Sequence, residues 1–357
     1  MLSSVNPAGT NGFDFLEFTT SDPSKLIAQF ESLGFVSLAR HRDHDVVIYQ
    51  QNNIRFIINL SPTSAAAHFA KQHGASVSAM GFRVDNAERA FQYALSQGAE
   101  EYVPQDDENI YTIPAIRGVG GSVIYFVDYQ HNGPNYQTHF RTDLSNFHPN
   151  TGAGLTYIDH VTHNLHRGNM DIWADFYARL FNFREIRYFD IEGKLTGLKS
   201  RAMTSPCGKI RIPLNESSDD KSQIEEFLKD FNGEGIQHIA LGTDDIYQSV
   251  EQLRAKKIVF LDTPDTYYEL VDKRLPNHGE PVDVLKKNRI LIDGNTASDK
   301  LLLLQIFTAN MLGPVFFEII QRKGDEGFGE GNFRALFESI ELDQIRRGVL
   351  KSEDETV

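Results

Sequence analysis

Two histidines and one glutamate, each in the middle of a predicted strand, are the residues of this sequence best suited to metal chemistry. They are His160 in YIDHVTHNL, His238 in GIQHIAL and Glu318 in GPVFFEII. They lie far apart along the chain, so no short helical metal motif applies and folding must bring them together. Two neutral imidazoles and one carboxylate on one face of a metal leave other positions open, as in non-haem Fe(II) oxygenases. The set therefore predicts a mononuclear metal site with room for substrate and dioxygen.

Each of these residues also has an ordinary structural interpretation. A single strand histidine is more often hydrogen-bonded in a core than bound to metal, and a single strand glutamate more often faces solvent. The apolar run around Glu318 predicts a buried strand, where an ionised carboxylate needs a cation, hydrogen bonds or a raised pKa. His163 follows His160 by three residues and is expected on the opposite face of the strand, so we do not assign it as a ligand.

An internal repeat divides the chain into two related halves. The strand and helix in GFDFLEFTTSDPSKLIAQFESLGF recur as YIDHVTHNL followed by MDIWADFYARLFNF. The segment VSAMGFRVDNAERAFQYALSQGA aligns without a gap with IQHIALGTDDIYQSVEQLRAKKI, and GSVIYFVD pairs with GPVFFEII. Repeats of this size indicate duplicated supersecondary units, here a strand and a helix followed by further strands.

Overlaying the two halves favours the metal interpretation. The three polar candidates of the second half are matched in the first half, roughly position by position, by apolar residues: Phe15 for His160, Ala79 for His238 and Phe126 for Glu318. Surface residues would be polar in both halves. The contrast indicates that the second half holds something that the first half does not.

The repeat also predicts the architecture. Two units in each half predict an α+β protein of two domains, each made of paired βαβββ modules (open barrels) whose strands curl around a central space. The polar segment 141–155 contains Gly and Pro and is the expected boundary. We therefore expect a non-catalytic domain over residues 1–150 and a catalytic, metal-binding domain over residues 151–357.

A hinged helix is expected after the glutamate strand. Gly327, Gly329 and Gly331 form a flexible segment. Beyond it, apolar residues recur with helical spacing and predict an amphipathic helix: Phe333, Leu336, Phe337 and Ile340. An aromatic-faced helix tethered beside a buried carboxylate is expected to act as a lid over the site.

The composition describes a soluble globular protein. The chain has 357 residues, 40% hydrophobic and 24% charged, with a formal net charge of −14. That charge repels nucleic acid phosphates, and no block of Lys and Arg offsets it. No apolar run approaches the roughly 18 residues of a membrane helix, and the N-terminal segment has no secretory pattern. We expect a cytoplasmic protein with no nucleic acid or membrane partner.

Three other segments with reactive residues are given structural interpretations. Cys207, the single cysteine, lies between Pro206 and Gly208 in a predicted turn and is expected to be a structural or exposed thiol. The HRDHD cluster at residues 41–45 has metal-like composition but is expected to be a solvated turn. The GFGEG segment is a weak phosphate-loop candidate, because Glu326 and Glu330 would repel phosphate and no Walker lysine follows.

The segments YIDHVTHN, YFDIEGKLTGL, IPLNE, FNGEGIQHIAL, LLLLQIFT, FFEIIQRKG and GFGEGNFRALFESIE closely resemble the 4-hydroxyphenylpyruvate dioxygenase family. The resemblance covers nearly all of residues 150–350 and, more loosely, the first half. It implies the vicinal oxygen chelate (glyoxalase-like) superfamily, whose βαβββ modules agree with the repeat. It also implies an enzyme of tyrosine and phenylalanine catabolism that uses Fe(II) and O2 to convert 4-hydroxyphenylpyruvate to homogentisate and CO2.

The resemblance further implies roles for individual residues. His160, His238 and Glu318 would hold the iron, and Gln237, Gln305 and Phe333 would take part in catalysis. The substrate pocket would be lined by Ser200, Asn215, Gln223, Phe307, Phe316, Asn332 and Phe333. Aromatic faces suit a substrate ring, and amides or a hydroxyl can orient a phenol. Each polar pocket residue could equally satisfy backbone groups, and Phe307 and Phe333 could equally be core residues.

Other functions remain open on the sequence alone. A hydroxymandelate synthase would share the fold, the ligands and the substrate but would oxidise the benzylic carbon. An extradiol catechol dioxygenase would share the ligand set without needing a 2-oxo acid, and a metal-free binding protein could use the same modules. A homo-oligomer is expected, because the first half carries no ligands and is free to serve in assembly.

Overall fold

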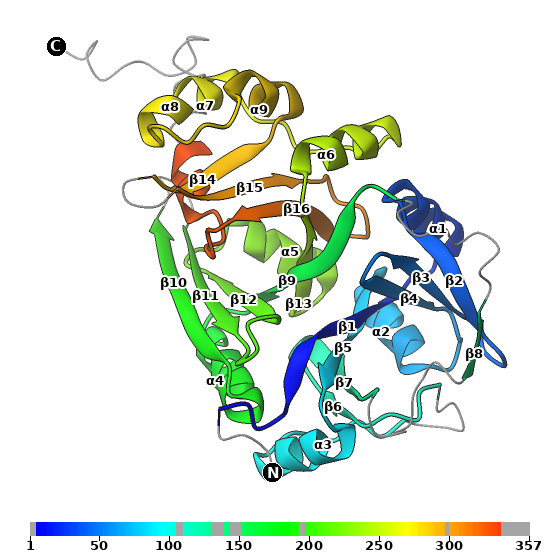
Figure 1. The fold of residues 1–357 in the computed structure, drawn as a ribbon. Coiled ribbons are helices and arrows are strands. Elements are labelled where there is room, and N and C mark those ends of the chain that lie inside the picture. Colours follow the sequence, from blue (N-terminus) through cyan, green and yellow to red (C-terminus); the bar gives the residue numbers. More distant parts are fainter. Residues whose placement is uncertain are drawn as a thin grey trace.

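The computed structural model contains two eight-stranded sheets. The two sheets are curved, lie side by side and are flanked by helices (Figure 1). It describes residues 5–104, 110–129, 139–142, 152–192, 197–296 and 300–336. All strands of the first sheet come from residues 10–142 and all strands of the second from residues 155–323. The expected boundary segment lies largely outside the described residues.

The first sheet has the strand order β6-β7-β5-β1-β4-β3-β2-β8. Its strands are β1 (Thr10–Thr19), β2 (Val36–His41), β3 (Val46–Gln51), β4 (Ile54–Asn59), β5 (Ser76–Val84), β6 (Ala115–Arg117), β7 (Val123–Val127) and β8 (Phe140–Thr142). The helices of this half are α1 (Pro23–Ser32), α2 (Ala65–His73) and α3 (Ala87–Ser96), with a 3-10 turn at Val119–Gly121.

The second sheet has the strand order β10-β11-β12-β9-β13-β16-β15-β14. Its strands are β9 (Leu155–Leu165), β10 (Arg184–Glu192), β11 (Gly197–Thr204), β12 (Arg211–Ser217), β13 (Gly235–Thr243), β14 (Leu291–Asn295), β15 (Leu301–Phe307) and β16 (Phe316–Lys323). The helices are α4 (Met170–Phe181), α5 (Gln223–Phe231), α6 (Ile246–Ala255), α7 (Asp265–Glu269), α8 (Val271–Arg274) and α9 (Val282–Asn288), and residues 330–336 are also helical.

The strand pairing confirms the duplicated modules. In each module the first strand pairs in parallel with the last, as β1 does with β4, β5 with β7, β9 with β12 and β13 with β16. The two modules of each half then join through their first strands, which are antiparallel: β1 with β5 and β9 with β13. Each half is thus a pair of modules curled around a common concave face.

The register corrects one position of the repeat alignment. His238 pairs with Phe316 and Ala240 with Glu318, whereas Ala79 pairs with Val123 and Gly81 with Tyr125. The residue matching Glu318 is therefore Tyr125, and the expected match with Phe126 was wrong by one residue. A slip of one residue moves a side chain to the other face of the sheet, and Phe126 packs in the other hydrophobic cluster.

Polar caps fix where the helices begin, and they recur in both halves. Ser64 and Ser222 accept a hydrogen bond from a backbone N–H in the first turn of α2 and α5, and Asn86 and Asp245 do the same for α3 and α6. Each such cap stabilises a helix by about 1 kcal/mol. Matching caps therefore place matching helices against the two sheets.

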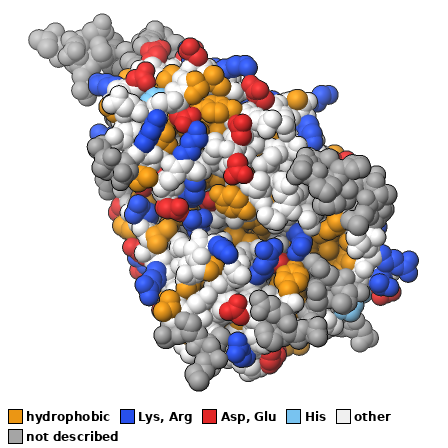
Figure 2. All heavy atoms as spheres, viewed as in Figure 1, with side chains coloured by type: hydrophobic (Ala, Val, Ile, Leu, Met, Phe, Trp, Pro, Cys, Tyr) orange, Lys and Arg blue, Asp and Glu red, His pale blue; other side chains and the backbone are white. Residues whose placement is uncertain are grey.

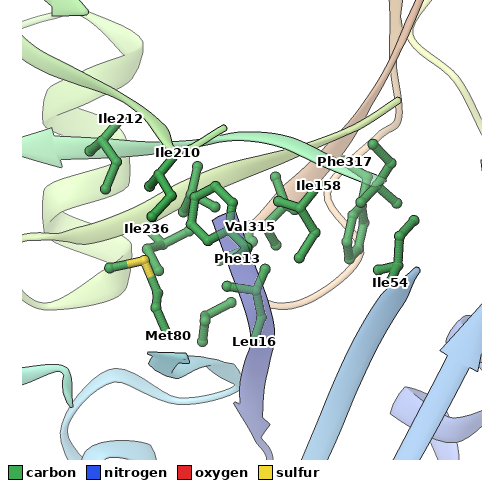
Figure 3. Close-up of a cluster of buried hydrophobic side chains, with 14 of the residues drawn as sticks. Phe13, Leu16, Ile54, Met80, Ile158, Ile210, Ile212, Ile236, Val315 and Phe317 are labelled. Atoms are coloured by element: carbon green, nitrogen blue, oxygen red, sulfur yellow. The ribbon is translucent and has the colours of Figure 1, made fainter. Parts of the chain in front are cut away.

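A continuous hydrophobic core joins the two halves (Figure 3). Phe13, Leu16 and Met80 of the first half lie among Ile158, Ile236 and Val315 of the second in this view. The ring of Phe18 stacks on Phe317 with centroids 6.5 Å apart. Since burying each large apolar side chain contributes about 1.5–3 kcal/mol, this contact holds the two halves in a fixed arrangement.

The visible surface mixes charges of both signs. In Figure 2, Lys and Arg side chains are interspersed with Asp and Glu, with no extended basic block on this face. Within the described part of the chain, no helix combines the length and the apolar character that a transmembrane span needs.

Candidate metal centre

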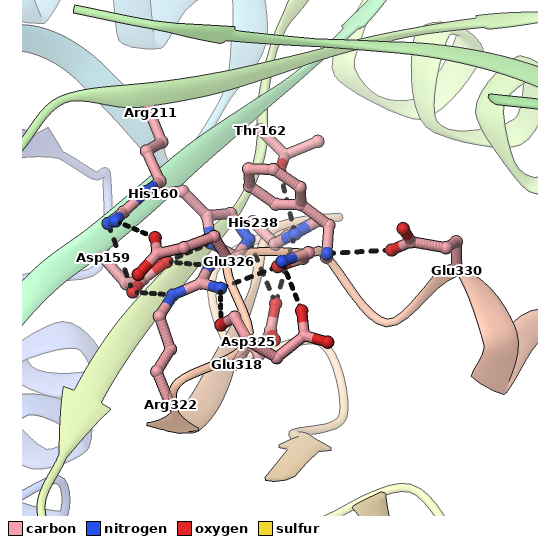
Figure 4. Close-up of polar contacts among 12 residues, drawn as sticks. Asp159, His160, Thr162, Arg211, His238, Glu318, Arg322, Asp325, Glu326 and Glu330 are labelled. Carbon is pink, nitrogen blue, oxygen red and sulfur yellow. Dashed lines mark hydrogen bonds and ion pairs between the residues drawn. The ribbon is translucent and has the colours of Figure 1, made fainter. Parts of the chain in front are cut away.

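The three predicted ligands converge from three adjacent strands of the second sheet (Figure 4). His160 lies on β9, His238 on β13 and Glu318 on β16. Oε2 of Glu318 lies 3.2 Å from Nε2 of His160 and 3.6 Å from Nε2 of His238. Among the described residues, this is the one group of three His, Cys, Asp or Glu side chains close enough to share an ion.

Two β-bulges aim the histidines. On β9, Ile158 and His160 pair with consecutive residues of β13, so Asp159 is an extra residue. On β13, Ile236 and His238 pair with consecutive residues of β9, so Gln237 is extra. A bulge bends the strand and redirects its side chains. As a result, each bulge residue bonds the histidine that follows it.

Those bonds fix the ring orientation of both histidines. Nδ1 of His160 lies 2.8 Å from Oδ1 of Asp159, and Nδ1 of His238 lies 3.1 Å from Oε1 of Gln237. Since both partner oxygens are acceptors, each Nδ1–H donates, and each Nε2 is left with a lone pair. A second partner that fixes the tautomer is typical of metal-binding histidines.

Asp159 is held in turn by a network of arginines. It is fully buried, and Arg322 donates to both of its carboxylate oxygens at 2.7 and 2.8 Å. Arg211 lies 3.6 Å away and pairs with Glu326. Burial alone would raise the pKa of Asp159, but the hydrogen bonds from Arg322 and His160 hold that pKa well below its usual range. Asp159 is therefore a fixed anion behind His160.

The two histidines have opposite electrostatic environments. Burial acts to lower the pKa of His160, yet Glu318 and Asp159 together raise it. For His238, burial and the neighbouring charge of His160 lower the pKa well below its usual value. Its Nε2 accepts a hydrogen bond from the hydroxyl of Thr162 at 2.9 Å. The site therefore combines a neutral His238 with a carboxylate that attracts positive charge.

The donor set fits a divalent transition metal. Oε1 of Glu318 is buried and has no hydrogen-bond partner, and such an orphaned acceptor is costly unless a cation or donor meets it. Ligand bonds of about 2.0–2.2 Å, as nitrogen and oxygen make to zinc, would bridge the observed separations with small side-chain shifts. Two imidazoles, one carboxylate and open positions match the facial triad of non-haem iron sites.

Aromatic rings border the metal centre. Phe316 stacks on the ring of His238 with centroids 5.0 Å apart and an interplanar angle of 18°. Phe307 lies edge-on to His238 at 6.3 Å, and Phe328 edge-on to His160 at 5.2 Å. These rings limit the polar space next to the ligands and leave flat apolar surfaces for a substrate ring.

The predicted polar pocket residues fall into two groups. Ser200 and Asn215 face each other across β11 and β12, and Gln305 is buried on β15 with Oε1 unpartnered. Gln305 is therefore the polar pocket residue with a spare acceptor. By contrast, Gln223 is the exposed first residue of α5.

The last two predicted residues belong to the helix over residues 330–336. Asn332 is buried, and its Oδ1 accepts hydrogen bonds from Tyr267 at 2.6 Å and Arg274 at 3.3 Å, so it anchors the helix against α7. Phe333 is 44% exposed. The helix begins at residue 330, earlier than expected, because Asp293 of β14 accepts the backbone N–H of Gly331. Phe337 and Ile340 lie outside the described residues.

The sequence did not predict that Asp159, Arg322 and Phe328 would lie next to the candidate ligands. The repeat did contain a sign of Asp159, since Asp14 in FDF aligns with Asp159 in IDH. Asp14 is likewise an extra, buried residue in its strand and pairs with Arg83 at 2.8 Å. Arg322 and Phe328 gave no comparable signal, because their contacts arise only from the fold.

Two further expectations meet different outcomes. His163 is fully buried and lies edge-on to Tyr177 of α4, on the face expected for a residue that is not a ligand. The HRDHD cluster is only partly the solvated turn that we expected: His41 is 9% exposed and stacks on His139, with centroids 5.8 Å apart. Packing of β8 beside β2 covers this histidine.

Comparisons with known proteins agree with this geometry. A family profile described as hydroxyphenylpyruvate dioxygenase, N-terminal, matches residues 4–141, and one for the glyoxalase/bleomycin resistance protein/dioxygenase superfamily matches residues 157–270. The chain is 57% identical to Hemolysin VllY of Vibrio vulnificus over 99% of its length and 100% of that protein. It is 55% identical to 4-hydroxyphenylpyruvate dioxygenase of Pseudomonas aeruginosa, over 97% of each chain.

One solved structure has the same fold at much lower sequence identity. A mutant of 4-hydroxymandelate synthase from Streptomyces coelicolor superposes with a TM-score of 0.80, covering 94% of this chain and 99% of that one, at 25% identity. The two-sheet architecture is therefore shared with an enzyme named for a different product.

Proposed function

The chain belongs to the 4-hydroxyphenylpyruvate dioxygenase family, and from this membership we propose that its metal is Fe(II), held by His160, His238 and Glu318. It is a dioxygenase, and the reaction is the conversion of 4-hydroxyphenylpyruvate and O2 to homogentisate and CO2. The observation that carries the ligand assignment is the convergence of the three side chains on one point, with Oε1 of Glu318 buried and unpartnered.

The proposed ligands contribute different groups to the ion: the histidines would contribute neutral nitrogen atoms, and Glu318 a charged oxygen. Nε2 of each histidine faces the metal position because its Nδ1–H is engaged by Asp159 or Gln237. Glu318 supplies negative charge that brings the site near neutrality. Fe(II) held by His160, His238 and Glu318 would supply the redox chemistry toward O2.

The surrounding residues are proposed to hold the substrate. Phe307, Phe316 and Phe333 would provide flat surfaces for the ring. Gln305, Ser200, Asn215 and Gln237 would orient its polar ends, and Gln305 has the spare acceptor for this role. The exposed Gln223 would reach the substrate from the first turn of α5. Asn332 is proposed to act by anchoring the helix that carries Phe333, which would exclude water.

We also propose that the first half, residues 1–150, is non-catalytic, and that residues 151–357 form the catalytic domain. The absence of a second His/Glu group among the described residues supports this division. We further propose that the protein works in the cytoplasm. We also propose that it is a homo-oligomer, and light scattering on the purified protein would test its oligomeric state.

Product analysis tests the proposed reaction. Protein loaded with Fe(II) should convert 4-hydroxyphenylpyruvate to homogentisate, with CO2 released in equal amount. The shared fold with 4-hydroxymandelate synthase makes 4-hydroxymandelate the informative alternative product. If it dominates, the proposed reaction is wrong while the metal assignment stands.

Substitution of one ligand tests the metal assignment separately. Glu318→Ala should lose both iron binding and turnover, because two imidazoles alone hold Fe(II) weakly. Glu216→Ala, which removes a carboxylate of the same half that caps α4, serves as the matched control and should keep its iron. Anaerobic addition of 4-hydroxyphenylpyruvate to the loaded protein should give a weak visible charge-transfer band, which reports chelation before any chemistry.

A further inference from the structure

The concave face of the first half encloses a cavity that the proposed reaction does not use. Its volume is about 380 Å3, in the range of small-molecule pockets. Glu17 of β1, Asn59 of β4 and Tyr125 of β7 line it, together with Tyr102 and Tyr111. Glu88 and Glu101, both exposed, lie at its edge. Among its described lining residues there is no Lys, Arg or His.

This cavity lies beside the first-half counterpart of the metal centre, because Tyr125, one of the three counterpart residues, lines it. Strand register makes Tyr125 the counterpart of Glu318 and Ala79 the counterpart of His238. It also makes Glu17 the counterpart of Thr162, because Glu17 pairs with Ala79 as Thr162 pairs with His238. The duplicated fold has therefore kept a concave site in the first half and changed the groups that line it.

The most distinctive of those groups is Glu17. It is 3% exposed and accepts hydrogen bonds from Tyr111 at 2.6 Å, Ser78 at 2.9 Å and Asn59 at 3.2 Å. All three donors are neutral, and no Lys, Arg or His of the described chain forms an ion pair with it. Three preorganised donors hold a carboxylate in place but supply no positive charge. Glu17 is thus a buried carboxyl group with three neutral hydrogen-bond donors and no ion-pair partner among the described residues.

The walls of the cavity suit an organic cation. Tyr111 and Tyr125 line the cavity with ring centroids 5.2 Å apart, and the fully buried Phe15 packs against both at 5.9 Å. Aromatic faces attract cations and also bury apolar groups. Glu17 also lines an adjoining cavity that contains Arg117 and His68, and the guanidinium of Arg117 lies over the ring of Tyr102 at 4.8 Å.

We propose that this cavity is a second ligand site that binds a small organic ammonium ion, with its nitrogen beside Glu17 and its apolar body against Tyr111 and Tyr125. The carboxylate of Glu17, the aromatic walls and the acidic edge all favour a positively charged ligand. Burial raises the pKa of Glu17, against the effect of its three hydrogen bonds. A bound cation would stabilise the ionised form, so ligand binding and ionisation of Glu17 support each other.

Calorimetry with three compounds of similar size tests the proposal: phenethylammonium, the neutral 2-phenylethanol and the anionic 3-phenylpropanoate. The full-length protein should bind the cation at least tenfold more tightly than either comparator. In Glu17→Gln the preference for the cation should fall at least tenfold, because the charge is lost while the shape is kept. Glu216→Gln changes another buried carboxylate and should leave binding unchanged.

The Glu318→Ala variant separates this cavity from the metal centre. Binding of phenethylammonium should persist in Glu318→Ala, and loss of binding there would assign the ligand to the metal centre and overturn the proposal. Equal affinity for the three compounds, or no measurable binding of the cation, would overturn it as well. If Glu17→Gln does not fold, the comparison of the three compounds on the unmodified protein still tests the preference for the cation, and equal affinity would overturn the proposal.

Discussion

Asp159 lies 2.8 Å from Nδ1 of His160, although the two residues are adjacent in one strand. Neighbouring side chains of a regular strand point to opposite faces. The bulge at Asp159 removes that alternation and puts an acceptor behind a proposed metal ligand. The one extra residue in this strand thus fixes the orientation of the imidazole ring of His160.

Removal of this carboxylate should weaken metal binding. In Asp159→Asn the group behind His160 loses its charge, and we expect metal affinity to fall by about 10–100-fold, the usual effect of losing such a partner. Fluorescence-detected metal titration measures it. Asp14→Asn is the matched control, because Asp14 is also a buried bulge residue paired with arginine. Both variants should lose stability, but only Asp159→Asn should lose metal affinity; equal affinities would contradict the orienting role.

Arg322 should control the loop that follows β16. Its guanidinium donates to Asp159 and also to the backbone carbonyls of Asp325 and Gly327, at 3.0 and 2.7 Å. Arg322→Gln should therefore release residues 325–328, and their backbone amides should exchange hydrogen at least tenfold faster. Arg83→Gln, which breaks the matching pair with Asp14, should leave this loop protected. Unchanged exchange in Arg322→Gln would show that other contacts hold the loop.

His163 should make the protein sensitive to acid. Complete burial lowers its pKa to about 4, from 6.5 for an exposed histidine. Between these values the unfolded state binds the proton and the folded state does not, so stability falls as the pH drops from 6.5 towards 4. The loss is at most about 3.4 kcal/mol. Urea unfolding across this range should show a flatter pH dependence in His163→Leu, and an unaltered one in a variant of the exposed His166.

Gly329 should be needed for the position of Gln305. Its φ is +77°, and a Cβ there would collide with the side-chain amide of Gln305. Gly329→Ala should raise KM for the substrate about tenfold and cost about 1–2 kcal/mol of stability for the left-handed backbone. Gly208→Ala isolates the backbone cost, since Gly208 has a φ of +72° with nothing near its Cβ position. A KM that rises equally in both variants would remove Gln305 from the explanation.

The repeat was visible in the sequence because strands and amphipathic helices follow simple periodicities. The convergence of His160, His238 and Glu318 could be anticipated because the two histidines break an apolar pattern that the first half keeps. The bulges could not be inferred, since an extra residue in a strand has no periodic signature. The match of Phe126 with Glu318 failed for a related reason: register depends on pairing with β13 and β5, which the chain order does not reveal.

The start of the last described helix also depends on a residue that is distant in the sequence. Residue 330 begins the last described helix because Asp293, on a strand far back in the chain, accepts the N–H of Gly331. Local spacing placed the helix three residues later. Likewise, Arg322 reads in the sequence as an ordinary charged residue after a strand, and its role becomes visible only when β16 lies beside β9 and β13.

The bulge that carries Asp159 is present in the first half as well, with Asp14 buried behind Phe15. The first half therefore holds the backbone frame of a metal site, complete with its orienting carboxylate, but without ligands. Histidine in place of Phe15 and Ala79, and glutamate in place of Tyr125, would put three donors onto that frame. The duplicated frame thus offers a place to engineer a second metal site beside the one proposed for the second half.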